Sequence, residues 1–222
     1  VQLMDMTQGM ERFRITLKGL PGGMLQNRMT VDQLLALRDK TGKKSKSAAR
    51  PSLQDEAAAK VHLNGDGKPC IPRTMLLASL MNAGVFIRLD QKRQLSTKEA
   101  SLLPGLLFLD DESYPLLMPD TGDESEWGFA PWRYEVRQGR NPNGGEAVCI
   151  VRPLFEKWAI SFYAVLDTDE LEENTFHRLF TLAGTRIGIG DNRPQRKGSF
   201  GMFCITRWEK CGGAKDVVIA AA

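Results

Sequence analysis

The stretch RIGIGDNRPQRKGSFG, residues 186–201, decides the interpretation of this chain. It holds four glycines, three basic residues after Gly190, and one acid. Glycines let a backbone pass close to a bulky ligand and expose its N–H groups, and interspersed Arg and Lys neutralise phosphates. The spacing matches neither the dinucleotide fingerprint nor a Walker loop, which argues against a mononucleotide site. On composition alone, a long flexible connection between a helix and a strand is the alternative.

Periodic segments on both sides of this stretch predict an α+β fold. Residues 12–18 (RFRITLK) alternate apolar and charged side chains, as a half-buried strand does. The order of the elements is compatible with a ferredoxin-like (RRM-like) βαββαβ core that carries insertions. After the first strand, the expected elements are a helix from Pro72 to Gly84, adjacent strands at 147–152 and 158–165, a helix with Phe176, Leu179, Phe180 and Ala183 on one face, and a strand at 200–208.

Composition is that of a globular protein. The chain has 222 residues, of which 42% are hydrophobic and 26% charged, so we expect a single domain over residues 1–222 with one buried core. The longest apolar stretch, residues 76–87, is too short to cross a bilayer. The N-terminal residues lack the basic start and apolar block of a secretory signal. We therefore expect a cytoplasmic protein with no membrane partner.

Charge is distributed unevenly along the chain. Residues 38–50 hold six basic side chains and one acid, and residues 110–126 hold seven acids and no base. We expect the first segment to be a mobile basic insertion and the second to be a solvated acidic loop. Such separation also suits a protein with oriented partners.

A second segment, PCIPRTMLL at residues 69–77, precedes the glycine-rich stretch 186–201. The two segments follow one another in the order found in a known family. Residues 69–77 resemble the Ile-Pro-Gly-Ser-Ser-Leu-Lys helix start of the RAMP superfamily, the repeat-associated proteins of CRISPR systems, and residues 186–201 resemble the family's C-terminal glycine-rich signature. The resemblance covers about 140 residues in two islands. Thr74 and Leu76 match the pattern, whereas its lysine is missing, and Arg73 is positioned to substitute for it.

The resemblance implies a site on the sugar-phosphate backbone of RNA, in backbone-forming subunits that polymerise along a guide RNA, with compact relatives in phage genomes. It also implies that the basic insertion, with Lys43, Lys44 and Lys46, engages RNA or neighbouring copies. The other residues it assigns to the nucleic acid are Arg73, Thr74, Arg186, Gly188, Gly190, Arg193, Arg196, Lys197, Gly198 and Gly201.

The segment 127–140 interleaves aromatic side chains with Arg133, Arg137 and Arg140. Aromatic faces stack on exposed bases while arginines hold phosphates, as in proteins that bind single strands. Trp132 is therefore a further candidate for nucleic-acid binding. The alternative is that Trp132 and Tyr134 anchor a β-hairpin to the core.

Catalytic and metal-binding patterns are weak. His62 and His177 are the two histidines, and a lone histidine is more often structural than catalytic. The four cysteines form no CxxC pair, so a zinc site at Cys204 and Cys211 is disfavoured, and buried, reduced thiols are expected. We expect no catalytic residues, no metal and no cofactor.

The leading hypothesis is a non-catalytic protein that binds single-stranded nucleic acid, in the first place RNA, through its phosphates. It would act as one copy of a CRISPR-like or phage assembly, alongside copies of itself or other effector subunits. The first alternative is an assembly protein in which the acidic and basic segments pair copies head to tail. The second, less favoured, is a RAMP endoribonuclease that uses a histidine or a metal.

Overall fold

The structure, a computed structural model, describes residues 9–29, 33–35, 51–91, 93–140 and 145–213. Its strands are β1 (Met10–Gly19), β2 (Met24–Leu25), β3 (Cys70–Pro72), β4 (Leu107–Leu109), β5 (Ser113–Pro115), β6 (Arg133–Arg140), β7 (Ala147–Phe155), β8 (Ala159–Asp167) and β9 (Phe203–Gly213). The helices are α2 (Leu53–Ala58), α3 (Arg73–Gly84), α4 (Leu103–Leu106) and α5 (Glu173–Leu182), with short 3-10 segments η1 (Glu124–Glu126) and η3 (Pro194–Arg196) and a π-helical turn η2 (Ala183–Ile187).

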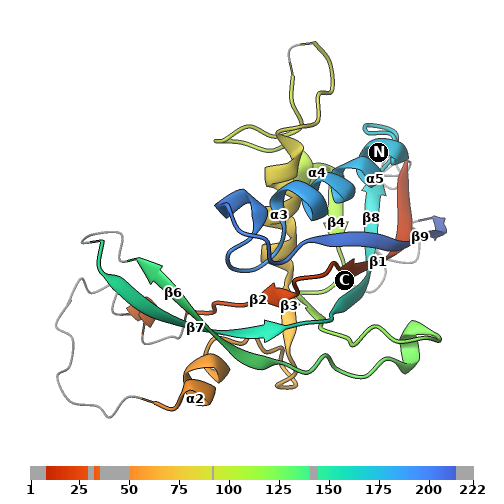
Figure 1. Ribbon diagram of the computed structural model, residues 1–222. Coiled ribbons are helices and arrows are strands. Elements are labelled where there is room, and N and C mark those ends of the chain that lie inside the picture. Colours follow the sequence, from red (N-terminus) through yellow and green to blue (C-terminus); the bar gives the residue numbers. More distant parts are fainter. Residues whose placement is uncertain (1–8, 30–32, 36–50, 92, 141–144, 214–222) are drawn as a thin grey trace.

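The main sheet is antiparallel, with the strand order β4-β8-β1-β9. β1 lies at its centre, and the alternation of residues 12–18 works as predicted. Phe13, Ile15 and Leu17 are fully buried on one face, while Arg12 and Arg14 lie on the other. Helices α3 and α5 lie against the sheet (Figure 1). This mixture of antiparallel sheets and few helices agrees with the predicted α+β class.

Both helices contribute the predicted faces to one core. On α5, the ring of Phe180 lies 6.3 Å from Phe162 of β8 and 5.5 Å from Trp208 of β9, measured between centroids. On α3, Leu76 and Leu80 are fully buried in the same cluster. Pro72 precedes the first residue of α3 with an extended backbone, as expected of a residue that cannot donate a helical hydrogen bond.

A second sheet has the order β2-β7-β6, which contradicts one prediction. Residues 147–152 and 158–165 do form strands, but they are not adjacent: β7 pairs with β2 and β6, whereas β8 pairs with β1 and β4. The chain leaves one sheet and enters the other at Glu156–Trp158, where Trp158 is fully buried. The β6–β7 hairpin consequently extends beyond the main sheet, with α2 next to it (Figure 1).

The acidic segment 110–126 is only partly a loop. β5 lies within it and pairs with β3, and Tyr114 is 1% exposed. The predicted solvated loop is wrong at these positions because apolar side chains between the acids enter the core. The basic segment 38–50 lies outside the described residues.

Two further observations concern thiols and membranes. Cys70 is buried, as expected of a small apolar residue, but Cys149, Cys204 and Cys211 are exposed, and all four are free thiols. None of the helices in the described residues combines the length and the apolar character needed to span a bilayer.

Candidate nucleic-acid interface

Residues 186–201 form a loop that is tied to itself and to the start of the chain. Gly188 N donates to Ala183 O at 2.7 Å, Ile189 N to Gly201 O at 2.8 Å, and Gly201 N to Gly23 O at 2.8 Å. Because backbone bonds hold the loop at several points, it is a folded element and not the long flexible connection that composition also allowed.

The glycines of the loop serve its own packing. A Cβ at Gly201 would lie 1.7 Å from Ile189 O, and one at Gly190 would lie 2.3 Å from Leu25 O, both far inside contact distance. Gly188, Gly190 and Gly201 are buried. Their contact with a nucleic-acid backbone stays a prediction. Close contacts with the protein's own backbone already account for glycine at these positions.

Polar side chains attach the loop to α3. Ser79 Oγ donates to Gly188 O at 3.0 Å, and Gln195 Nε2 donates to Asn82 Oδ1 at 2.7 Å. Within the loop, Arg193 Nη1 donates to Gly190 O at 2.9 Å. Partial burial, together with the nearby charge of Arg196, lowers the pKa of Arg193. Arg193 therefore both shapes the loop and contributes charge to its surface.

A groove of about 940 Å³ separates the loop from the β6–β7 hairpin. Four predicted basic residues from two distant segments meet in it: Arg137 from β6, and Arg193, Arg196 and Lys197 from the loop, with Gly198 beside them. Arg152 of β7 also lines the groove, where its Nε donates to Asp191 Oδ2 at 2.8 Å. Five cations against one acid give the groove a positive surface of the kind that attracts a polyanion.

Arg137 is the cation best placed to change partners. Its guanidinium lies 4.7 Å from the centroid of the Phe200 ring, and its Nη1 is buried without a hydrogen-bond partner. A guanidinium presents donors in a planar fork that matches phosphate oxygens. Arg137 therefore brings to the groove wall a guanidinium with one donor that the described residues leave unsatisfied.

The two segments that carry the family resemblance meet next to the groove. Thr74, at the start of α3, lines a pocket of about 290 Å³ together with Gly188, Gly190 and Arg193. His62 lines the same pocket, and burial, followed by the charge of Arg28, lowers the pKa of its imidazole. A neutral imidazole at pH 7 follows, since the usual value is already below 7.

The other predicted residues lie elsewhere. Arg73 Nη1 donates to Leu109 O at 3.4 Å, and the guanidinium of Arg186 lies 5.1 Å from the ring of Phe86. Arg133 is paired with Glu135 and Glu156, each at 2.8 Å, and lies with Trp132 in a separate pocket of about 330 Å³. Arg140 ends β6. Lys43, Lys44 and Lys46 lie outside the described residues.

The aromatic side chains of segment 127–140 are expected from the sequence either to stack on bases or to anchor a hairpin to the core. Trp132 packs against the core cluster, as an anchor does, whereas Tyr134 is 42% exposed. Neither lines the groove, and of the candidates predicted in this segment it is Arg137 that lies there with the glycine-rich loop, next to Gln138 and Gly139.

Sequence reasoning missed Arg152 and Asp191. The signal that could have identified Arg152 is its position as a single charge within the otherwise uncharged strand AVCIVRPLF. Across the described residues, no group of three or more His, Cys, Asp or Glu side chains could hold a metal ion.

Comparisons with known proteins reach only the level of the fold. No family model matches the chain, and no curated protein is similar to it. A chain in the cryo-EM structure of the type III-B Cmr-beta bound to cognate target RNA is similar, with a TM-score of 0.54 and 9% sequence identity. The similarity covers 91% of this chain but 61% of the Cmr-beta chain, so the protein spans less than two thirds of that chain's length. At this identity, the likeness shows a shared fold and not a shared activity.

Proposed function

We propose that the protein binds single-stranded RNA through its phosphates, without cleaving it, as a RAMP-like subunit of a CRISPR-like or phage-encoded assembly. The observation that carries the proposal is the groove, where Arg137, Arg196 and Lys197 converge from strand and loop against one acid. Binding by phosphates predicts little sequence preference and strong salt dependence.

The fold supports the same proposal. The elements β1-α3-β4-β8-α5-β9 follow the order βαββαβ, and their strands are arranged β4-β8-β1-β9. We interpret this as a ferredoxin-like core into which β2, α2, β3 and the β6–β7 hairpin are inserted, within one domain. The similar Cmr-beta chain belongs to an assembly bound to target RNA, which makes RNA and other subunits the expected partners here.

The test uses the full chain and a labelled single-stranded RNA in fluorescence anisotropy. The double variant Arg196→Ala/Lys197→Ala removes two exposed charges of the groove but keeps Arg193, because Arg193 also holds Gly190. We expect an affinity loss of about tenfold or more, similar for RNAs of different sequence, and a salt slope smaller by about 1.4.

The matched control is Lys98→Ala/Arg178→Ala, which removes the same charge at two exposed positions that do not line the groove. An unchanged affinity in the groove variant, or an equal loss in the control, would remove the groove from the site. The intact protein should also leave labelled RNA uncut in the presence of Mg²⁺; discrete products would revive the ribonuclease alternative.

Head-to-tail assembly remains the alternative from a different class. Two members of the acidic segment, Asp110 and Glu124, are paired with arginines of their own main sheet, so that part of the segment's charge is not available to a neighbouring copy. Light scattering of nuclease-treated protein, with and without added RNA, separates the two functions.

A further inference from the structure

The outer face of the main sheet, away from the helices, carries a second set of basic side chains. Arg12, Arg14 and Lys18 alternate along β1, and Arg207 of β9 lies opposite Thr16. Ser161 and Tyr163 of β8 complete this surface, and Tyr163 is 36% exposed. This outer face is separate from the groove, because none of these residues lines the groove.

An acidic hairpin, residues 116–130, folds back onto the outer face. Its stem is fixed by backbone bonds, from Ala130 N to Leu116 O at 2.9 Å and from Met118 N to Gly128 O at 2.8 Å, and Leu117 bonds to β8. Its tip holds Asp120, Asp123, Glu124 and Glu126 and no base. Within the described residues, Glu124 is the one side chain of the tip that forms an ion pair.

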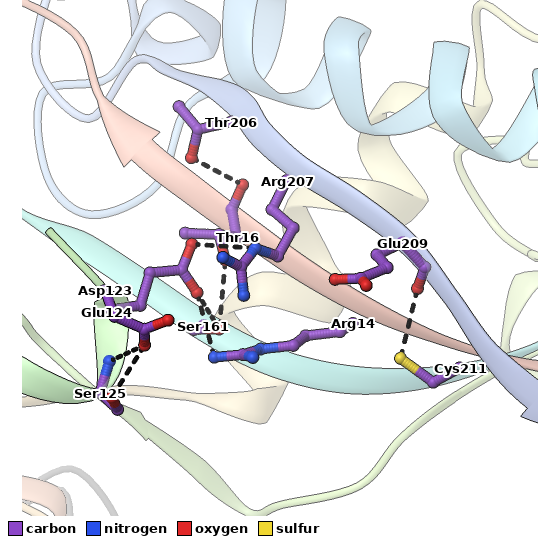
Figure 2. A network of polar contacts seen from close by, with 10 residues as sticks. All are labelled: Arg14, Thr16, Asp123, Glu124, Ser125, Ser161, Thr206, Arg207, Glu209 and Cys211. Carbon is purple, nitrogen blue, oxygen red and sulfur yellow. Dashed lines mark hydrogen bonds and ion pairs between the residues drawn. The ribbon is translucent and has the colours of Figure 1, made fainter.

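The carboxylate of Glu124 lies in a site, called the seat below, that is formed by Arg14 of β1, Ser161 of β8 and Arg207 of β9 (Figure 2). One carboxylate oxygen accepts from Arg14 Nη2 at 3.4 Å and from Ser161 Oγ at 3.1 Å, and the other lies 3.5 Å from Arg207 Nε. The Glu124 side chain is 8% exposed, and each arginine is less than 30% exposed. Two guanidinium groups and a hydroxyl group are the donors that proteins use to hold a phosphate.

The fit of the carboxylate in this seat is loose. Both arginine contacts are longer than the roughly 2.7–2.9 Å of a tight charge-assisted hydrogen bond. One carboxylate is shared between two guanidinium groups, while Asp123 interacts electrostatically with both of them and Glu209 lies opposite Arg14 in the strand register. A phosphodiester, with more acceptor oxygens, would satisfy both guanidinium groups, and Lys18 is a further exposed cation along β1.

We propose that the outer face is a second surface for single-stranded RNA, and that Glu124 of the acidic hairpin holds it closed by occupying a phosphate position. The proposal rests on the proposed function for its ligand but not for its location. Because the stem is fixed and the tip is tied to the sheet at one carboxylate, a bound strand can displace the tip without unfolding the sheet. Tyr163 lies opposite Arg14 in the strand register, with the guanidinium of Arg12 4.2 Å from the centroid of its ring, and a base of the bound strand would stack on the ring face that Arg12 leaves open.

The test compares full-length proteins in anisotropy titrations with labelled single-stranded oligouridylate. Glu124→Gln keeps the shape of the side chain and removes its charge. Glu126→Gln removes the same charge from the same tip without a contact to the arginines, and is the matched control. We expect Glu124→Gln to bind about three- to tenfold more tightly than the wild type, with a steeper salt dependence, and Glu126→Gln to stay within about twofold.

The same substitution in the Arg196→Ala/Lys197→Ala background separates this proposal from the proposed function. A gain from Glu124→Gln that persists there supports a second surface, and a gain that disappears there overturns it. Equal affinities of the Glu124 and Glu126 variants, with a weakened groove variant, refute the second surface and leave the groove intact. Loss of all RNA binding in every protein, wild type included, refutes both.

Two further measurements keep the result interpretable. Hydrogen exchange at residues 118–128 of the wild type should rise when RNA is added, since displacement of the tip breaks its contacts with the sheet; unchanged exchange contradicts displacement. If Glu124→Gln instead gains affinity for polyglutamate as large as that for RNA, the occupant is an acidic protein segment and the RNA assignment is wrong.

Discussion

Arg152 on β7 and Asp191 in the glycine-rich loop form an ion pair, with Nε 2.8 Å from Oδ2, that joins the two walls of the groove. The side chain of Arg152 is 16% exposed, and that of Asp191 is 37% exposed. The pair therefore links segments 39 residues apart at a partly desolvated position, where removing one partner leaves the other charge uncompensated.

Asp191→Asn should lower the free energy of unfolding by about 1–2 kcal/mol, because Arg152 then loses its charged partner in a partly buried site. Urea unfolding followed by circular dichroism measures the change. Arg93→Ala is the control, since its pair with Asp90 joins side chains that are 70% and 45% exposed, and it should change the free energy of unfolding much less. Equal effects in the two variants would mean that the Arg152–Asp191 pair adds nothing beyond a surface contact.

Gly201→Ala should disrupt the loop. Its φ is +71°, and the new Cβ would lie 1.7 Å from Ile189 O, so both backbone strain and a backbone clash oppose it. We expect a loss of about 3 kcal/mol or more in the free energy of unfolding. Gly65→Ala is the control, because nothing lies within 4 Å of its Cβ position; a Gly201→Ala protein as stable as this control would contradict the described loop.

His62 predicts a loss of stability in mild acid. Its pKa in the folded protein is lowered from 6.5 by burial, so the unfolded chain binds a proton that the folded protein resists. Above pH 6.5, His62 is neutral in both the folded and the unfolded chain and does not change the free energy of unfolding. Below pH 6.5, the unfolded chain takes up the proton more readily, so the free energy of unfolding falls as the pH drops. His62→Gln should flatten the change in urea midpoint between pH 7.5 and 5.5, both chosen to bracket about 6.5.

The control for this experiment is His177→Gln, which removes a histidine whose ring lies against Trp208 on the exposed side of α5. The pH dependence of the His62→Gln protein should differ from that of the control as well as from the wild type. Identical curves for all three proteins would exclude His62 as a source of acid sensitivity.

Trp132→Ala and Tyr134→Ala should differ in what they affect. Trp132 packs against the core, so its removal should cost about 2–4 kcal/mol of unfolding free energy. Tyr134 is 42% exposed, and its removal should change stability by no more than about 0.5 kcal/mol. Calorimetry measures both, and RNA titrations of Tyr134→Ala test base stacking directly: an affinity loss without a stability loss would make Tyr134 part of the interface.

Local periodicity made the main elements predictable. β1 follows from the alternation in residues 12–18, α3 from Pro72 just before its start, and α5 from three apolar residues that share one buried face. In each case neighbouring residues in the sequence determine which side faces the core, so the information is local. The pairing of β7 and β8 with different sheets is not local, because it depends on strands more than a hundred residues away.

The groove was predictable in part for the same reason. Glycines and basic residues are concentrated in residues 186–201, so composition identified Arg193, Arg196 and Lys197. That Arg137 would meet them, and that Arg73 and Arg133 would not, depends on tertiary contacts that composition does not contain. The single charge of Arg152 marks an exception within its strand, but the loop that it meets through Asp191 lies 39 residues away and is not evident from the sequence.

A two-residue strand has a consequence for how fast the groove can load. Met24 and Leu25 of β2 pair with β7. Leu25 O also accepts from Asp191 N of the loop, and Gly23 O, just before the strand, accepts from Gly201 N. The hairpin wall and the loop wall of the groove are therefore both bonded to β2. The distance between the two walls is fixed before a ligand binds. Association with RNA should then be limited by diffusion and long-range electrostatic attraction, with no slow conformational step. Its rate constant should therefore fall as the ionic strength rises.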